Sequence, residues 1–434
     1  MPKKKKSWKE RQSERQKKQQ GSQKGYQKQS ERETKRKPRH WPIGKILVAV
    51  SIIVLIVGVY AVWQYTMKPF TTIYIRADGS VDPSEAPILN VENSYYTFTG
   101  DIYGSLVIEK DNIVVDGANF RLSGQGGTSS KGVDLSERSN VTITNMRLKD
   151  FGYGVSLYLA SNNVLSQNDL TNNNHGIGLD SSSDNTVSGN NIANNQDGIS
   201  LTSSSDNIIH KNIITNNQYS LSLAYSSGNV ISENDIAHSD GAIGLSYSSN
   251  NKITENSIAN NQYSVSITYN SSSNSISGNS ITDSDGAVLL SSSNNNNVSG
   301  NQIDNNQEGI RIDSSSGNSV SGNTIANGEA AITLYSSSDN LITENDVTSN
   351  QYGIALTSSS DNSIFHNSFV SNTNQVFSSD SRNAWDDGYP SGGNYWSDYQ
   401  NSYPDAEELD DSGIWNTLYV IDDDNSDNYP LMNR

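Results

Sequence analysis

The sequence predicts an all-β fold, a parallel β-helix built as a solenoid of 22-residue coils, preceded by one N-terminal transmembrane helix. Three observations predict it. A 22-residue pattern repeats ten times from about residue 162 onwards. Its four apolar columns hold apolar residues at 39 of 40 positions, and Ser378 is the exception. An uncharged apolar run at residues 46–63 just reaches the length that spans a bilayer.

Charge divides the 434-residue chain into two very different parts. Residues 1–45 carry a net charge of +13, and the remainder carries −30. The basic segment is rich in Lys, Arg, Gln and Ser and cannot form a core, so we expect a disordered cytoplasmic tail. Its basic runs suggest either nucleic-acid binding or a topology signal that touches anionic lipid headgroups. We favour the second interpretation and expect no nucleic-acid partner.

Residues 46–65 are expected to form the transmembrane helix. Trp41 before the apolar run and Tyr60, Trp63 and Tyr65 at its far end resemble interfacial anchors. A cleaved signal peptide would have a shorter basic region and a small-residue cleavage site, and a buried core helix would have a polar stripe. The positive-inside rule then predicts a single-pass cell-membrane protein with a cytoplasmic N-terminus and an extracellular β-helix.

Each repeat combines short strands with bends. In one unit, Ile199 and Leu201 alternate with period two, while Val187 and Ile192 flank a Gly-Asn pair. This spacing is typical of three short strands with one buried face, and it has no helical period. One coil cannot bury its own apolar face, so stacking of coils must create the core.

The repeat is marked by columns of asparagine, with a second Asn five residues after the first. Stacked amides form hydrogen-bonded ladders, and Asn tolerates the left-handed backbone of sharp bends. Ligand binding is the alternative, and we favour the ladder. The first column is Asn163, Asn185, Asn207, Asn229, Asn251, Asn274, Asn296, Asn318, Asn340 and Asn362.

The repeats lie between two less regular segments. We expect an N-terminal β-rich cap at residues 66–111, β-helix repeats at residues 112–378, and a C-terminal cap at residues 379–434 that is rich in Trp, Tyr, Gly and Asp. Caps are expected because an open rod end would expose unpaired strand edges.

The N-x-I/V-x-x-N-x-I…G-I-x-L repeat resembles the NosD-like family of right-handed parallel β-helix proteins. The segments IYIRADGSV, VVDGANFRLSG and NAWDDGYPSGGNYWSDY resemble membrane-anchored or secreted prokaryotic surface members. The resemblance covers about residues 71–434 and implies the right-handed form of the fold. It implies little about activity, because the fold hosts lyases, hydrolases, epimerases and adhesins.

Catalytic and copper motifs are weak in the sequence. Asn174-His175-Gly176 approaches a polygalacturonase-like motif, but no Asp pair stands in adjacent coils at its position. The cationic side chains of the repeats, which a polysaccharide lyase would need near its acidic cluster, lie coils apart from one another. The five His occupy different places in their coils, Cys is absent and Met is scarce, so we expect no dedicated copper site.

Two tyrosine columns predict carbohydrate contact on the β-helix surface. Tyr219 and Tyr263 precede the third strand of their coils, with Gln218 and Gln262 as polar partners. Small residues at the outward positions between the columns would give a shallow floor edged by rings, which suit the C–H faces of sugars. The alternative is a stacked ladder that only stabilises the rod, and we favour it for the second column. That column is Tyr225, Tyr247 and Tyr269.

A turn in the C-terminal cap resembles the start of a calcium loop. Oxygen side chains stand at positions 1, 3, 5 and 9 with Gly413 at position 6, and position 12 lacks an acidic residue. Calcium is therefore the one candidate cofactor. Its expected ligands are Glu408, Asp410, Ser412 and Asn416.

These observations favour a non-catalytic glycan-binding or structural module at the cell envelope, with an envelope polysaccharide as partner. A carbohydrate-active enzyme of the lyase, hydrolase or epimerase type is the alternative. A purely structural spacer or protein-binding surface protein is the third hypothesis. The acidic ectodomain argues against anionic polymers unless calcium bridges them.

Overall fold

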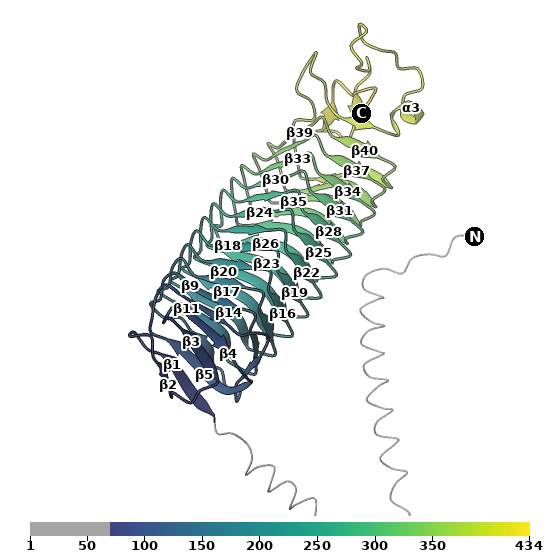
Figure 1. Ribbon diagram of the computed structural model, residues 1–434. Helices are drawn as coiled ribbons and strands as arrows, with labels where there is room; N and C mark the ends of the chain where they lie inside the picture. Colours follow the sequence, from purple (N-terminus) through teal and green to yellow (C-terminus); the bar gives the residue numbers. More distant parts are fainter. Residues whose placement is uncertain (1–69) are drawn as a thin grey trace, which may run out of the picture. The chain divides into compact units, whose positions relative to one another are not determined.

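A computed structural model describes residues 70–434, which form a long parallel β-solenoid of the right-handed type (Figure 1). Each coil contributes three short strands, as the repeat predicts, and the core and repeat length agree with the sequence pattern. The transmembrane segment expected at residues 46–65 and the basic tail lie outside the described residues. Within residues 70–434, no helix has the length and apolar character needed to cross a membrane.

Sheet A contains the longest strands of the solenoid, and it includes an antiparallel partner of its first strand, β2 (Val81–Asp82). The parallel strands are β1 (Thr71–Ile75), β5 (Ile102–Ile108), β8 (Lys131–Asp134), β11 (Tyr153–Tyr158), β14 (His175–Asp180), β17 (Asp197–Thr202), β20 (Tyr219–Ala224), β23 (Gly241–Ser246), β26 (Tyr263–Thr268), β29 (Gly286–Ser291), β32 (Glu308–Asp313), β35 (Ala330–Tyr335), β38 (Tyr352–Thr357) and β41 (Asn374–Ser379).

Sheet B has 14 strands, and all but the first run parallel. They are β3 (Ile88–Val91), β4 (Tyr95–Phe98), β6 (Ile113–Asp116), β9 (Val141–Thr144), β12 (Val164–Ser166), β15 (Thr186–Ser188), β18 (Ile208–His210), β21 (Val230–Ser232), β24 (Lys252–Thr254), β27 (Ser275–Ser277), β30 (Asn297–Ser299), β33 (Ser319–Ser321), β36 (Leu341–Thr343) and β39 (Ser363–Phe365).

Sheet C completes each coil and is joined to sheet A through β5. Its strands are β7 (Arg121–Ser123), β10 (Arg147–Lys149), β13 (Asp169–Thr171), β16 (Asn191–Ala193), β19 (Ile213–Thr215), β22 (Asp235–Ala237), β25 (Ser257–Ala259), β28 (Ser280–Thr282), β31 (Gln302–Asp304), β34 (Thr324–Ala326), β37 (Asp346–Thr348), β40 (Ser368–Val370) and β42 (Tyr395–Trp396).

Bends between the strands use a residue in the left-handed backbone region, followed by a buried polar side chain. In one coil the left-handed residues are Ser203, Asp206, Lys211 and Asn216, with φ between 49° and 56°. The buried residues that follow them are Ser204, Asn207, Asn212 and Asn217. The ladder asparagines therefore do not adopt the left-handed conformation themselves, contrary to expectation, because their side chains must point inward to bond the neighbouring coil.

The asparagine ladders are confirmed. The Asn207 Nδ2 donates to Asn229 Oδ1 at 3.1 Å and to the carbonyl of Ser182 at 3.0 Å. Its Oδ1 accepts the backbone N–H of Asn185 at 2.9 Å. The same pattern recurs along both predicted columns, so buried backbone groups at the bends are satisfied by amides. A third column around Asn195 and a serine column around Ser204 do the same and were not predicted.

The region expected to be an N-terminal cap takes part in the solenoid. Strand β1 pairs in parallel with β5, and β5 pairs in parallel with β8. Two antiparallel pairs, β1–β2 and β3–β4, add to this end. The parallel ladder therefore begins at Thr71, and the hairpins supply partners for the first strands.

An aromatic cluster lies at the C-terminal end of the solenoid, where α3 (Tyr399–Ser402), β43 (Tyr419–Val420) and β44 (Ser426–Asp427) fold beyond the last coil (Figure 1). Trp396 stacks on Phe369 of β40 with centroids 4.7 Å apart and on Tyr419 at 4.4 Å. The cap also extends the ladder, because Asn367 Nδ2 donates to Asn394 Oδ1 at 3.0 Å. Ser378 breaks the apolar column where Asn425 Nδ2 reaches its hydroxyl at 3.4 Å.

Candidate functional site

The outward face of sheet A carries one column with most of the chemically distinctive side chains. We call it the edge column, because it occupies the first position of successive strands. Strand register places its members in line from coil to coil. The column consists of Lys131, Tyr153, His175, Asp197, Tyr219, Gly241, Tyr263, Gly286, Glu308, Ala330, Tyr352 and Asn374.

Tyr219 and Tyr263 each lie beside a glycine of the following coil. A Cβ added at Gly241 would lie 3.2 Å from Cδ1 of Tyr219, and one at Gly286 would lie 3.4 Å from Cδ1 of Tyr263. The Cδ1–Cε1 side of each ring therefore lies beside the glycine, and the two tyrosines remain 46% and 49% exposed. Two coils separate them, which corresponds to about 10 Å. That interval is close to the length of a disaccharide in an extended polysaccharide.

Tyr225, Tyr247 and Tyr269 form a stack at the opposite end of the same strands. Their centroids are 5.0 and 5.7 Å apart with nearly parallel rings. All three have positive φ, at positions where other coils carry residues such as Ser203. Because the rings cover one another, only their edges and the outer faces of the stack contact solvent. This geometry agrees with the ladder interpretation, and a role in glycan contact stays a prediction.

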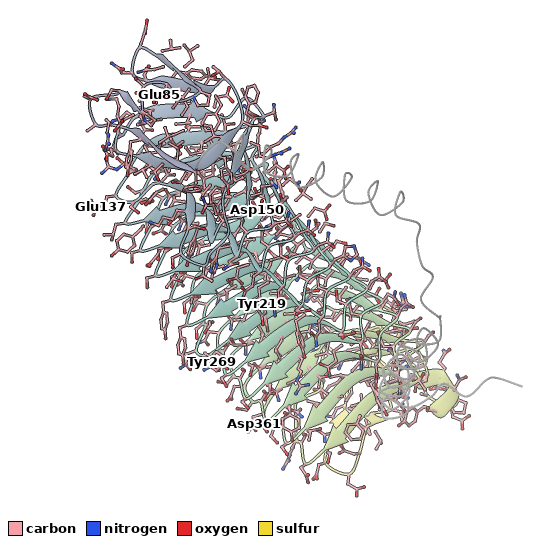
Figure 2. All side chains as sticks on the ribbon, turned by 90° about the horizontal axis from the view of Figure 1, so that it is seen from below. Glu85, Glu137, Asp150, Tyr219, Tyr269 and Asp361 are labelled. Atoms are coloured by element: carbon pink, nitrogen blue, oxygen red, sulfur yellow. The ribbon has the colours of Figure 1, made fainter. Side chains whose placement is uncertain are left out.

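The floor between the two tyrosine sets is made of small side chains. Gly244 has open space where a Cβ would be, and Ser222 and Ser266 are half-buried beside it. A six-residue strand spans about 20 Å, so the two sets cannot touch the same sugar ring. Figure 2 labels Tyr219 and Tyr269, one from each set. Gln218 and Gln262 are exposed at the bend next to the edge column, within reach of a ligand on Tyr219 or Tyr263.

An imidazole–carboxylate pair occupies the edge column two coils before Tyr219. His175 Nδ1 lies 2.9 Å from Asp197 Oδ2, and the ring of Tyr153 stacks on the imidazole at 4.4 Å with an angle of 9°. Ser200 Oγ is 3.4 Å from the same nitrogen. A carboxylate at Nδ1 favours the tautomer that leaves Nε2 as a hydrogen-bond acceptor. The sequence pattern did not predict this pairing, which the strand register of adjacent coils brings about.

The turn expected to bind calcium is held by its own hydrogen bonds. Glu408 Oε1 accepts the N–H of Gly413 at 2.7 Å, and Asn416 Oδ1 accepts the N–H of Glu407 at 3.1 Å. Asp410 adopts a left-handed turn conformation, and the Ser412 hydroxyl bonds the carbonyl of Leu409. Among residues 70–434, no three His, Asp or Glu side chains group as metal ligands. Calcium binding at this turn stays a prediction.

Asp427 is the most perturbed carboxyl among the described residues. It is fully buried in the C-terminal cap, and burial raises its pKa to about 7. Three N–H donors oppose that shift: the backbone of Asn394 at 2.7 Å, the indole of Trp396 at 2.9 Å and the backbone of Tyr429 at 3.1 Å. The group has no access to a ligand, so we assign it to the stability of the cap.

Comparison with solved structures finds other β-helix proteins. The structure is similar to the mannuronan C-5 epimerase AlgE4 A-module of Azotobacter vinelandii, with a TM-score of 0.47 and 14% identity over 65% of this chain and 91% of that chain. It is also similar to the DFA-IIIase of Arthrobacter chlorophenolicus A6, with a TM-score of 0.41 and 11% identity over 60% of this chain and 85% of that chain. The Dettilon tailspike protein matches with a TM-score of 0.40 and 16% identity, over 56% of this chain and 60% of that chain. Likenesses of this extent say nothing about function.

No curated protein sequence matches the chain significantly. A family model does match, and its description is periplasmic copper-binding protein (NosD). The match covers residues 93–270 and 223–401, which together exceed half of the chain and include the edge column. The chain therefore belongs to the NosD family.

Proposed function

We propose that this chain is a membrane-anchored protein of the cell envelope that binds a glycan along the edge column of sheet A. The observation that carries the proposal is the pair of exposed rings, Tyr219 and Tyr263, which lie two coils apart and each beside a glycine. Such rings present a flat apolar face with a polar hydroxyl at the rim. A polysaccharide running parallel to the rod axis would place every second sugar on a ring.

Polar groups next to the rings support the same arrangement. The exposed amides of Gln218 and Gln262 would bond sugar hydroxyls, and the small floor at Gly244 leaves room for the chain. Ligand sites commonly combine aromatic contact surfaces with a few polar groups that fix orientation. The membrane anchor at residues 46–65 and the extracellular location belong to this proposal.

Retention of a panel of neutral and acidic polysaccharides by the full chain, measured by affinity electrophoresis in mild detergent, tests the proposal. We expect retention by at least one polysaccharide and its loss in the Tyr219→Ala, Tyr263→Ala double variant. Tyr335→Ala is the matched control, because Tyr335 is also an exposed sheet-A tyrosine, 48% exposed, outside the edge column. Equal retention by the double variant and the parent would refute this site.

A carbohydrate-active enzyme is the second candidate function, and the His175–Asp197 pair favours it. His175 Nε2 would accept a proton from a bound sugar, while Asp197 would stabilise the imidazolium that forms. Both side chains are partly exposed, at 27% and 17%. Release of new reducing ends or unsaturated sugars, absent in His175→Ala, would support this function. Product formation that is unchanged in His175→Ala would exclude this pair.

A further inference from the structure

The first coils of the solenoid are less acidic than the rest of the described chain. Residues 70–150 hold seven Lys and Arg against eleven Asp and Glu, whereas residues 151–434 hold five against 32. A pocket of about 290 Å³ lies on the outward face of sheet C where these two regions meet. We call it the basic pocket. It is lined by Arg121, Arg147, Leu148, Lys149, Asp169 and Thr171.

Two arginines stand directly opposite each other in the basic pocket. Arg121 of β7 pairs in register with Arg147 of β10 on the next coil, and both are exposed. Like charges in this relation destabilise a sheet. Within residues 70–434 neither guanidinium has a hydrogen bond or ion pair, whereas Arg76 and Arg138 each have carboxylate partners. The Asp101 carboxylate accepts the backbone N–H of Arg121 at 2.8 Å and makes no ion pair with its guanidinium.

The carboxylate of Asp169, on the coil after Arg147, does not neutralise the two arginines. Asp169 follows Arg147 in register, but its Oδ1 accepts Asn191 Nδ2 at 3.0 Å and it forms no ion pair with the arginine. Lys149 Nζ instead contacts Asp150 at 2.9 Å. The two guanidinium groups are thus left for a ligand, and the hydroxyl of Thr171 adds a polar group to the wall.

We propose that the basic pocket binds one anionic sugar unit, through a carboxylate or a phosphate ester on the ring. Guanidinium forks match both acid groups, and pairing on adjacent coils places the backbones of the two arginines about 5 Å apart. The pocket volume is close to the ~300 Å³ lower end of ligand sites, which suits a single sugar. This site is separate from the edge column, so it changes the expectation that the acidic ectodomain avoids anionic polymers.

Chemical footprinting of the full chain in detergent tests the proposal without a variant that might misfold. Arginine modification by phenylglyoxal is followed peptide by peptide, with trigalacturonate as the carboxylate probe, glucose 6-phosphate as the phosphate probe and maltotriose as the neutral one. We expect one of the acidic probes to slow modification of Arg121 and Arg147 at least tenfold. Arg382, exposed and distant in sequence, is the internal control.

A matched variant distinguishes a built site from general charge attraction. In Arg147→Gln, protection of Arg121 should fall at least tenfold, whereas Lys252→Gln, which removes an exposed cation of sheet B, should leave it unchanged. Failure of both acidic probes to protect, equal protection by maltotriose, or equal protection of Arg382 would each overturn the proposal. Because the readout is local, it is independent of glycan retention at Tyr219 and Tyr263.

Discussion

Removing one amide from the Asn ladder should destabilise the solenoid far more than removing a surface amide. In Asn207→Ala, the buried backbone N–H of Asn185 loses its acceptor, and the carbonyl of Ser182 loses the Asn207 Nδ2 donor. Asn229 Oδ1 keeps another donor, the backbone N–H of Asn207. Two buried backbone groups are therefore orphaned. At about 1–3 kcal/mol each, the free energy of unfolding should fall by about 2–6 kcal/mol.

Denaturant unfolding followed by circular dichroism measures this loss, with Asn297→Ala as the matched control. Asn297 lies exposed on β30, and its side chain bonds only Ser299 Oγ, so its removal should cost less than about 0.5 kcal/mol. Hydrogen exchange adds a local readout, because the Asn185 amide should lose protection in Asn207→Ala. A midpoint equal to that of Asn297→Ala, with the Asn185 amide still protected, would refute the ladder argument.

Three further predictions concern the cap, the tyrosine stack and the calcium turn. Because burial raises the pKa of Asp427 to about 7 from 3.8, its contribution to stability is complete below pH 4 and is lost as the pH rises through 7, by about 4 kcal/mol. Asp427→Asn should flatten the dependence of the unfolding midpoint on pH between pH 5 and 8. A slope of midpoint against pH that equals that of the parent would contradict this. Tyr247→Ser should cost no more than about 1.5 kcal/mol and leave glycan retention intact, since the stack covers its own faces; lost retention would make the stack a ligand site. Calcium binding at the turn of Glu408, Asp410, Ser412 and Asn416 predicts a saturable rise in melting temperature at millimolar calcium, because the cation would bind the folded turn; an unchanged melting temperature would refute it.

The sequence predicted the repeat, the inward apolar columns and two amide ladders, because each follows from one 22-residue period. Asn207 and Ile209 occupy the positions that this period assigns to them. The sequence pattern assigned the left-handed conformation to the ladder asparagines, whereas the residue before each of them adopts it. A sequence pattern marks where the chain bends, but the residue whose φ turns positive depends on which neighbour must point inward.

The candidate site was only partly predictable. The edge-column positions of Tyr219 and Tyr263 follow from the repeat, but their packing beside Gly241 and Gly286 depends on side-chain rotamers. The His175–Asp197 contact needed the strand register to make a 22-residue spacing meaningful. The basic pocket lies in the less regular early coils, where the period fails, so Arg121 and Arg147 could not be aligned from the sequence.

A glycan-array screen of the full chain, run beside the Tyr219→Ala, Tyr263→Ala double variant, tests the central claim most directly. Glycan binding along the edge column predicts a defined set of hits for the parent chain that disappears in the double variant. Tyr335→Ala should keep that set. A blank array from parent protein with an intact β-sheet circular dichroism spectrum would contradict the account and favour a structural or protein-binding role.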